Sequence, residues 1–116
     1  MEKGDLMELT YKTKKLQRLC EDPTYNNELV KRYNIEVANK LPRRINELKA
    51  AVCLEDIPSS LPFRRHKLIG NLMGYFAINI TLQYRLIFKQ KDNNIIIEDL
   101  RKIKEIEIME VSKHYE

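Results

Sequence analysis

The sequence predicts an α+β domain, and three observations lead to that class. Hydrophobic residues recur at three- and four-residue steps in the N-terminal half, which is typical of helices. In the C-terminal half they alternate with polar residues, which is typical of strands. The 116 residues, 43% hydrophobic and 33% charged, have the length and composition of one globular domain. We therefore expect one domain over residues 1–116, with helices on one face of a small antiparallel sheet.

The N-terminal region begins with a predicted strand over residues 6–11, where apolar and β-forming residues are enriched. A helix is predicted over residues 12–20, because Leu16, Leu19 and Cys20 would share one face. Pro23 ends this helix, since a proline disfavours helical backbone in the residue before it.

Residues 26–53 carry the longest hydrophobic stripe of helical period, and Pro42 interrupts it. A proline inside a helix removes one backbone donor and clashes with the preceding turn. The region is therefore either two helices or one helix kinked at Pro42. Asn34 or Asn39 is available to cap a second helix. The N-terminal half is best interpreted as a helical hairpin that follows the first strand.

The C-terminal half alternates with a period of two, after a proline- and serine-rich loop over residues 57–62. Strands are predicted over residues 63–69, 75–82, 84–89 and 105–112, with turns at 70–74 and 90–94. In the second of these strands, Phe76, Ile78, Ile80 and Leu82 would share a face. If the Tyr84, Leu86 and Phe88 side of the next strand packs under the helices, Arg85 stands on the opposite, open face of the sheet.

Positive charge is concentrated in one part of the chain. Residues 57–91 contain no acidic side chain and six basic ones, Arg64, Arg65, Lys67, Arg85, Lys89 and Lys91, together with His66. Such a stretch is a candidate phosphate-binding surface. The alternative interpretation is an ordinary solvated face, because the net charge of +4 is mild.

Cysteine and histidine usage gives no sign of a metal site. Cys20 and Cys53 are far apart, and with His66 and His114 they show none of the spacings of metal ligands. Both cysteines are expected to be core residues of a reduced, cytoplasmic protein. The first residues lack the apolar run of a signal peptide, and no uncharged stretch is long enough to span a membrane.

The side chains of His66, Arg85 and His114, with Lys67, are of the types that cleave RNA without a metal. In that reaction the 2′-OH attacks the adjacent phosphate, so one group must take a proton, another must give one, and cations must stabilise the phosphorane. Histidine suits proton transfer near neutral pH, and arginine offers a planar fork to phosphate oxygens. The alternative is that these are surface residues with no catalytic role.

Two motifs resemble the HigB branch of the RelE/ParE toxin superfamily. One is the segment 66–79, with its His-x-Leu-x-Gly stretch and a glycine before an aromatic strand. The other is the Tyr-Arg-Leu-Ile-Phe strand over residues 84–88. A last strand that ends near His114, the basic segment 11–16 and the helical hairpin also fit, so the resemblance covers nearly the whole chain.

The resemblance implies a ribosome-dependent mRNA endoribonuclease without a metal cofactor, that is, an mRNA interferase. It implies that His66 is a catalytic or phosphate-binding histidine, that Arg85 stabilises the transition-state phosphate, and that His114 transfers a proton. Residues expected to bind the RNA phosphates are Arg64, Arg65, Lys67, Lys89 and Lys113. The partners implied are mRNA in the ribosomal A site and a HigA-like helix-turn-helix antitoxin, in a hetero-oligomer and without a membrane.

The last strand departs from the family pattern. Toxins of the HigB type often place an acidic and an aromatic residue just before the final histidine, whereas this chain has Ser112 and Lys113 there. Glu110 is expected on the same side of the strand as Ser112 and is the substitute acid. Two alternatives stay open: a ParE-like, non-enzymatic inhibitor of DNA gyrase, and an inactive relative that binds its antitoxin.

Overall fold

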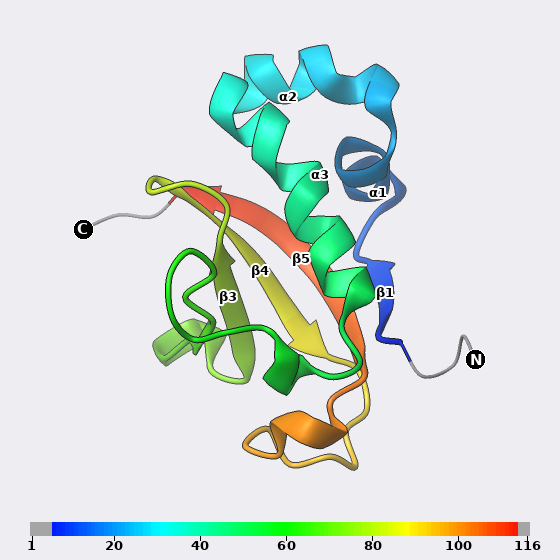
Figure 1. Ribbon diagram of the computed structural model, residues 1–116, viewed down its shortest axis with the longest axis vertical. Coiled ribbons are helices and arrows are strands. Elements are labelled where there is room, and N and C mark those ends of the chain that lie inside the picture. The colour runs from blue at the N-terminus through cyan, green and yellow to red at the C-terminus, as the bar shows by residue number, and fades with distance from the viewer. Residues whose placement is uncertain (1–5, 114–116) are drawn as a thin grey trace.

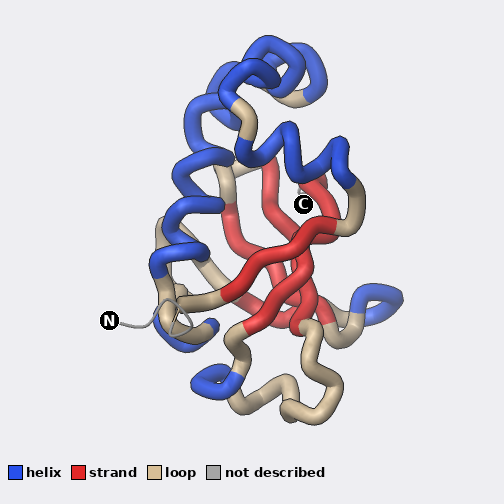
Figure 2. The backbone as a smooth tube through the Cα atoms, turned by 90° about the vertical axis from the view of Figure 1, so that its right-hand side faces the viewer, coloured by secondary structure: helices blue, strands red, loops and turns tan. Residues whose placement is uncertain are grey.

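Three helices lie on one face of a five-stranded sheet in the computed structural model, which describes residues 6–113 (Figure 1). The elements in chain order are β1 (Glu8–Tyr11), α1 (Lys14–Glu21), α2 (Asn26–Arg32), α3 (Ile35–Ala50), β2 (His66–Lys67), β3 (Tyr75–Asn79), β4 (Tyr84–Gln90) and β5 (Glu105–Lys113). Short 3-10 turns are η2 (Pro23–Tyr25), η3 (Leu54–Asp56), η4 (Gly70–Leu72) and η5 (Leu100–Lys102). The predicted α+β class is confirmed. In Figure 2 the long helices lie along the top and the left of the strands, and the short blue segments elsewhere are 3-10 turns.

The sheet has the order β1-β5-β4-β3-β2 and is mixed. Strands β2 to β5 pair antiparallel, as the sequence predicted, but β1 pairs parallel with the first half of β5. The three helices connect β1 to the rest of the chain, and a connection of that length allows a parallel edge strand that no hairpin could form.

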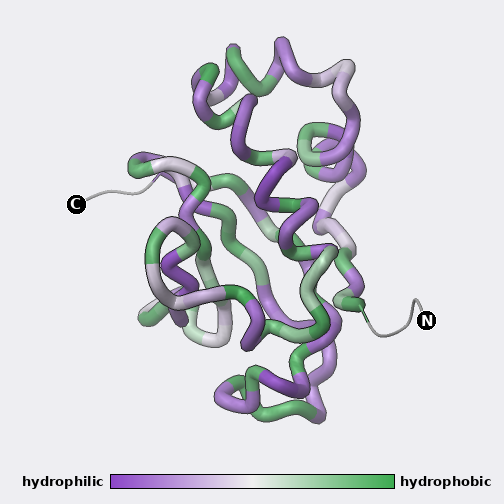
Figure 3. The backbone as a smooth tube through the Cα atoms, in the orientation of Figure 1, coloured by the Kyte–Doolittle hydropathy of each residue, from purple (hydrophilic) through white to green (hydrophobic). Residues whose placement is uncertain are grey.

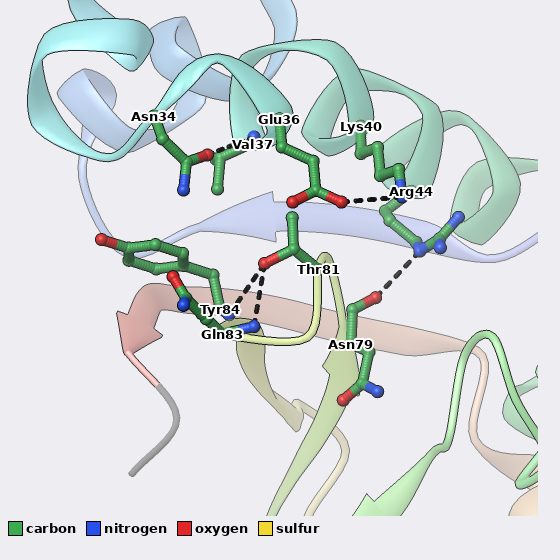
Figure 4. A network of polar contacts seen from close by, with 9 residues as sticks. All are labelled: Asn34, Glu36, Val37, Lys40, Arg44, Asn79, Thr81, Gln83 and Tyr84. Atoms are coloured by element: carbon green, nitrogen blue, oxygen red, sulfur yellow. Dashed lines mark hydrogen bonds and ion pairs between the residues drawn. The ribbon is translucent and has the colours of Figure 1, made fainter.

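The break between α2 and α3 falls at Asn34 and not at Pro42. Asn34 has an extended backbone, and its side-chain oxygen accepts a hydrogen bond from the Val37 N–H at 2.8 Å (Figure 4). Pro42 lies inside α3 and leaves the carbonyl of Ala38, four residues earlier, without its helical donor. The side-chain amide of Asn26 lies 3.5 Å from that carbonyl and donates to it. Of the alternatives that the sequence left open, the structure has two helices and the Asn34 cap, and their boundary does not lie at Pro42.

The main core lies between the helices and the sheet. Phe76 pairs with Phe88 and Ile78 with Leu86 across β3 and β4, all four side chains are fully buried, and the two phenyl rings stack at 5.7 Å. Figure 3 shows hydrophobic and hydrophilic positions alternating along the helices and strands. The predicted faces of both strands are thus confirmed up to Ile80.

Two predicted strands are shorter in the structure. β3 ends at Asn79, because the buried Thr81 hydroxyl accepts hydrogen bonds from the N–H groups of Gln83 and Tyr84 and forms a tight turn (Figure 4). Leu82, predicted to lie on the core face, is 85% exposed in that turn. The strand predicted over residues 63–69 is reduced to β2, since Arg64 has a φ of 50°, in the left-handed region. No helix within residues 6–113 is long and apolar enough to cross a membrane.

Candidate functional site

The sheet face that is not covered by helices carries the side chains that alternate with the core. On β4 these are Arg85, Ile87 and Lys89, because Leu86 and Phe88 face the helices. Arg85 pairs with Asn79 on β3 and with Ser112 on β5. Asn79, Arg85 and Ser112 therefore form one polar row across three neighbouring strands, which we call the Arg85 row.

Only part of this face is open. Leu68, Ala77 and Ile87 form a second, small buried cluster, with Leu72, Tyr75 and Met109 packed against it. Because Leu72 belongs to η4, the segment between β2 and β3 covers this cluster. The expectation that the whole face is free is thus wrong for its middle, and the polar part of the face is the Arg85 row with its flanks.

Arg85 is half-buried, and its Nε is a buried donor without a hydrogen-bond partner among residues 6–113. No carboxylate of the described chain lies within ion-pair distance of its guanidinium. A buried donor left without an acceptor costs free energy, so native proteins rarely keep one without a reason. The Nε itself is closed off from solvent, whereas the two Nη groups are not buried and make no hydrogen bond with the described chain, so they are the donors that an oxygen acceptor from outside it can reach.

His66 lies on the same face, because it pairs with Ala77 on β3. Its Nδ1 is 2.8 Å from the backbone carbonyl of Arg64. A carbonyl can only accept, so Nδ1 carries a proton, and in the neutral form of the ring this bond leaves the lone pair on Nε2. Two strand spacings, about 10 Å, and two residues along the strand, about 7 Å, separate His66 from Arg85 at the backbone. The two side chains can therefore meet on a substrate group between them without touching each other.

The predicted phosphate-binding residues differ in their surroundings. Lys67 forms an ion pair with Glu98 at 3.2 Å, and Lys89 lies 3.8 Å from Glu107 and over the ring of Tyr75. The Arg65 Nε donates to the backbone carbonyl of Ile57 at 2.7 Å. Arg64 is exposed, and within residues 6–113 its side chain has neither a hydrogen bond nor an ion pair. Neither Arg64 nor Arg65 has a carboxylate within ion-pair distance in the described chain, and of these two Arg64 is the one whose side chain is exposed and makes no hydrogen bond there.

Lys67 and Lys113 alternate to the other side of the sheet. Lys67 pairs with Phe76, and Lys113 pairs with Tyr84, whose ring packs edge-on against Tyr33 of the helical layer. His114 lies outside the described residues. Glu110 pairs with Ile87 next to a β-bulge and is exposed, and with Arg32 and Tyr33 of the helical layer it lines a shallow pocket at the edge of β5.

The sequence identified Arg85 and His66 as candidates but did not single out Asn79 and Ser112. Both flank Arg85 in the sheet register, and the Asn79 side chain has no hydrogen bond within the described part of the chain. The alternation of β3 does place Asn79 on the polar face. What the sequence lacks is the register that brings this residue beside Arg85.

Neither a reactive thiol nor a metal site is found near these residues. Burial, with the nearby Glu21 carboxylate as a smaller cause, raises the pKa of the Cys20 thiol to about 12, so this cysteine stays protonated and unreactive. Cys53 is also buried, as predicted. In the chain from Leu6 to Lys113, no three His, Cys, Asp or Glu side chains are grouped so that they could hold a metal ion.

The sequence matches the family model of the RelE-like toxin of the type II toxin–antitoxin system HigB, over residues 9–113. Among curated proteins the sequence has no significant match.

Three solved structures illustrate the similarity in fold. A mutant of YafQ from E. coli superposes with a TM-score of 0.54 at 18% identity, covering 92% of each chain. A YoeB/ParE toxin from Agrobacterium tumefaciens gives 0.51 at 17% identity, covering 94% of this chain and all of that one. YoeB in the YoeB–YefM complex from Staphylococcus aureus gives 0.51 at 17% identity, covering 94% and 98%. At these identities the likeness establishes a shared fold.

Proposed function

Because the chain belongs to the HigB-like family of RelE-like type II toxins, we propose that it is the toxin of such a pair and that it cleaves mRNA on the ribosome. One domain over residues 1–116 would carry this activity. The observation that supports the proposal is the Arg85 guanidinium, which is half-buried on the sheet face opposite α1, α2 and α3 and has neither a hydrogen bond nor an ion pair in the described chain. A phosphate or phosphorane oxygen is an acceptor of the required charge and geometry.

The proposed reaction is metal-independent attack of a ribose 2′-OH on the adjacent phosphorus. The Nε2 of His66 takes the proton of the 2′-OH, since the Arg64 carbonyl holds the ring with that nitrogen free. The 2′-oxygen–phosphorus bond forms, and Arg85 stabilises the negative charge on the equatorial oxygens. The bond from phosphorus to the 5′-oxygen then breaks, and His114 is proposed to donate the proton to this leaving oxygen. The products are a 2′,3′-cyclic phosphate and a 5′-hydroxyl.

The substrate is proposed to bind along the Arg85 row. Arg64 and Arg85 would contact neighbouring phosphates, with Arg65 beside them, while Lys89 would join once it leaves Glu107. Lys67 and Lys113 would contact RNA only from the edges of the sheet, because the register turns them to its other side. The site is a shallow face and not a cavity. Such a face suits an mRNA that the ribosome holds in position.

The partner that inhibits the toxin is proposed to be a HigA-like helix-turn-helix antitoxin in the cytoplasm, with which the chain forms a hetero-oligomer. The similar fold of YoeB, which has been solved in complex with YefM, supports an antitoxin as the partner in general terms. The mRNA is proposed to be cut in the ribosomal A site, where the ribosome supplies the positioning that a shallow site lacks.

The test is expression of the wild-type chain beside Arg85→Ala, His66→Ala and His114→Ala, with primer extension on a translated mRNA. Arg43→Ala is the matched control, since Arg43 is an exposed arginine on α3. We expect growth arrest and breaks inside translated regions for the wild type and the control, and loss of both for Arg85→Ala. Growth arrest with intact mRNA would overturn the proposal in favour of a gyrase inhibitor. A folded chain without any effect on growth would identify an inactive relative.

A further inference from the structure

A second arginine, Arg44 of α3, lies under the other face of the sheet and is only 8% exposed. Its Nε donates to the backbone carbonyl of Asn79 at 2.8 Å, and its Nη1 lies 3.0 Å from a carboxylate oxygen of Glu47. Its guanidinium also covers the ring of Phe63, 5.0 Å from the ring centre. Three different parts of the chain therefore meet at one side chain.

Two of these contacts converge on one junction. The N–H of Asn79 donates to the carbonyl of Phe63 at 2.7 Å, which attaches the segment before β2 to the end of β3. Arg44 holds both members of this pair, Asn79 through its carbonyl and Phe63 through its ring. Removal of the guanidinium would thus loosen this junction from both sides.

The segment that follows Phe63 needs external support. Arg64 occupies the left-handed region, which costs free energy for a residue with a side chain unless the surroundings fix it. Its N–H donates to the Ser60 carbonyl at 2.8 Å, and its own carbonyl accepts from the His66 ring. The conformation of Arg64 therefore determines both the direction of its own side chain and the orientation of His66.

The other residue that Arg44 holds lies directly beside Arg85. Figure 4 shows the Asn79 carbonyl pointing to Arg44 and the side-chain amide pointing the opposite way. On that side Asn79 pairs with Arg85 across the register of β3 and β4. The buried Arg44 guanidinium thus contacts two residues that are next to the candidate site. Phe63 precedes Arg64 in the chain, and Asn79 lies beside Arg85 on the neighbouring strand.

We propose that Arg44 is a positioning residue, which sets the distance between Arg85 on β4 and the pair Arg64 and His66 before and on β2. Arg44 does not touch the substrate. That this distance matters for RNA binding rests on the proposed function, whereas the effect of Arg44 on the distance can be tested without RNA. An arginine is needed because a planar fork donates to a carbonyl and covers an aromatic ring at the same time, whereas the lysine ammonium is a point charge.

The decisive experiment follows amide hydrogen exchange and the His66 ring signals by NMR in Arg44→Met. We expect faster exchange at the Asn79 and Arg64 N–H groups and a shifted His66 ring. Two control substitutions on the same helix distinguish a change in the position of His66 from a general loss of fold stability. Arg43→Met removes an exposed arginine, and Val37→Ala weakens the core at a fully buried residue about two helical turns before Arg44. The controls should leave the His66 signals unchanged, and Val37→Ala should raise exchange over the whole core. If Arg44→Met behaves like Val37→Ala, the proposal is overturned.

A binding measurement then connects the junction to RNA. The probe is a single-stranded 2′-O-methyl oligoribonucleotide, which cannot react because its 2′-oxygen is blocked. We expect Arg44→Met to weaken binding about tenfold, equivalent to about 1.4 kcal/mol, and both controls to bind as the wild type does. Arg44→Lys should recover only part of the loss. If the wild type does not bind this probe, the RNA-binding role fails, while the exchange data still decide whether Arg44 holds the junction.

Discussion

Each face of the sheet carries an arginine, buried Arg44 on the helix side and half-buried Arg85 on the other, and the two differ in how their donors are satisfied. On the helix side, Arg44 donates to the Asn79 carbonyl, pairs with Glu47 and covers Phe63. On the other side, Arg85 keeps a buried Nε without an acceptor among the described residues. An arginine whose donors are satisfied contributes to the fold, whereas one whose donors are not satisfied adds a cost that function must justify.

The same contrast holds for apolar packing. The helix side buries a core that runs from Met7 to Val111, while on the opposite side the hydrophobic cluster buried among residues 6–113 is limited to Leu68, Ala77 and Ile87, beneath η4. Consecutive residues of β4, Ile87 and Phe88, belong to different clusters. Stability therefore depends mainly on one face, which leaves the other free to carry charged side chains.

The largest expected effect is on the helix side. Phe88→Ala removes a fully buried ring that stacks on Phe76, so we expect the unfolding free energy to fall by about 3–5 kcal/mol. Ile87→Val, on the opposite face, should cost about 0.5–1.5 kcal/mol. Urea unfolding followed by circular dichroism measures both. Equal losses would show that the two clusters contribute alike and would remove the contrast.

The second effect separates activity from stability. Arg85→Ala should lower the rate of mRNA cleavage by about 10²–10³-fold, as expected when one donor to a developing oxyanion is lost. Its melting temperature should stay the same or rise, because the substitution removes an unsatisfied buried donor. Cleavage on programmed ribosomes and calorimetry are the two measurements. A large drop in melting temperature would instead show that Arg85 is structural.

The third effect is a loss of stability on removal of Arg44, in contrast to the unchanged or raised stability expected on removal of Arg85. Arg44→Met leaves the part-buried carbonyl of Asn79 without its side-chain donor, so we expect a loss of about 1–3 kcal/mol in unfolding free energy. Arg43→Met on the exposed side of the same helix should change it by less than about 0.5 kcal/mol. The measurement is again urea unfolding. Equal stability of the two variants would contradict a structural role for the Arg44 contacts.

The sequence predicted the class, the strand faces and the position of Arg85, because alternation and helical period are local signals. It placed Phe76, Ile78, Leu86 and Phe88 in the core correctly. It misplaced the helix break, because the Pro42 signal is local, whereas the Asn26 amide that satisfies the freed Ala38 carbonyl comes from another helix.

The site was only partly predictable for the same reason. Alternation put Arg85 on the polar face, but only the sheet register brings Asn79 and Ser112 beside it. The segment 63–69 has the composition of a strand, yet bonds of Arg64 and Arg65 to the 57–60 loop hold most of it outside the ladder. Arg44 gave no sequence signal at all, since its role depends on Phe63 and Asn79 meeting in space.

The smallest effect tests which face the RNA contacts. Glu107→Gln releases Lys89, on the Arg85 side, and should cost at most about 1 kcal/mol of stability, as for other partly exposed ion pairs. The released lysine is free for one more phosphate, so RNA should bind more tightly, with a salt dependence that is steeper by about 0.7 in the log–log slope. Fluorescence anisotropy with the 2′-O-methyl probe, over a series of salt concentrations, measures this slope.

Glu98→Gln is the matched control, because it releases Lys67 by the same chemistry. Lys67 pairs with Phe76, whose side chain faces the helices, so its ammonium is directed away from the Arg85 row. The affinity and the salt slope should therefore stay at their wild-type values in this variant. If Glu98→Gln strengthens binding as much as Glu107→Gln does, the RNA follows the edge of the sheet and not its open face, and the path proposed along Arg64 and Arg85 is wrong.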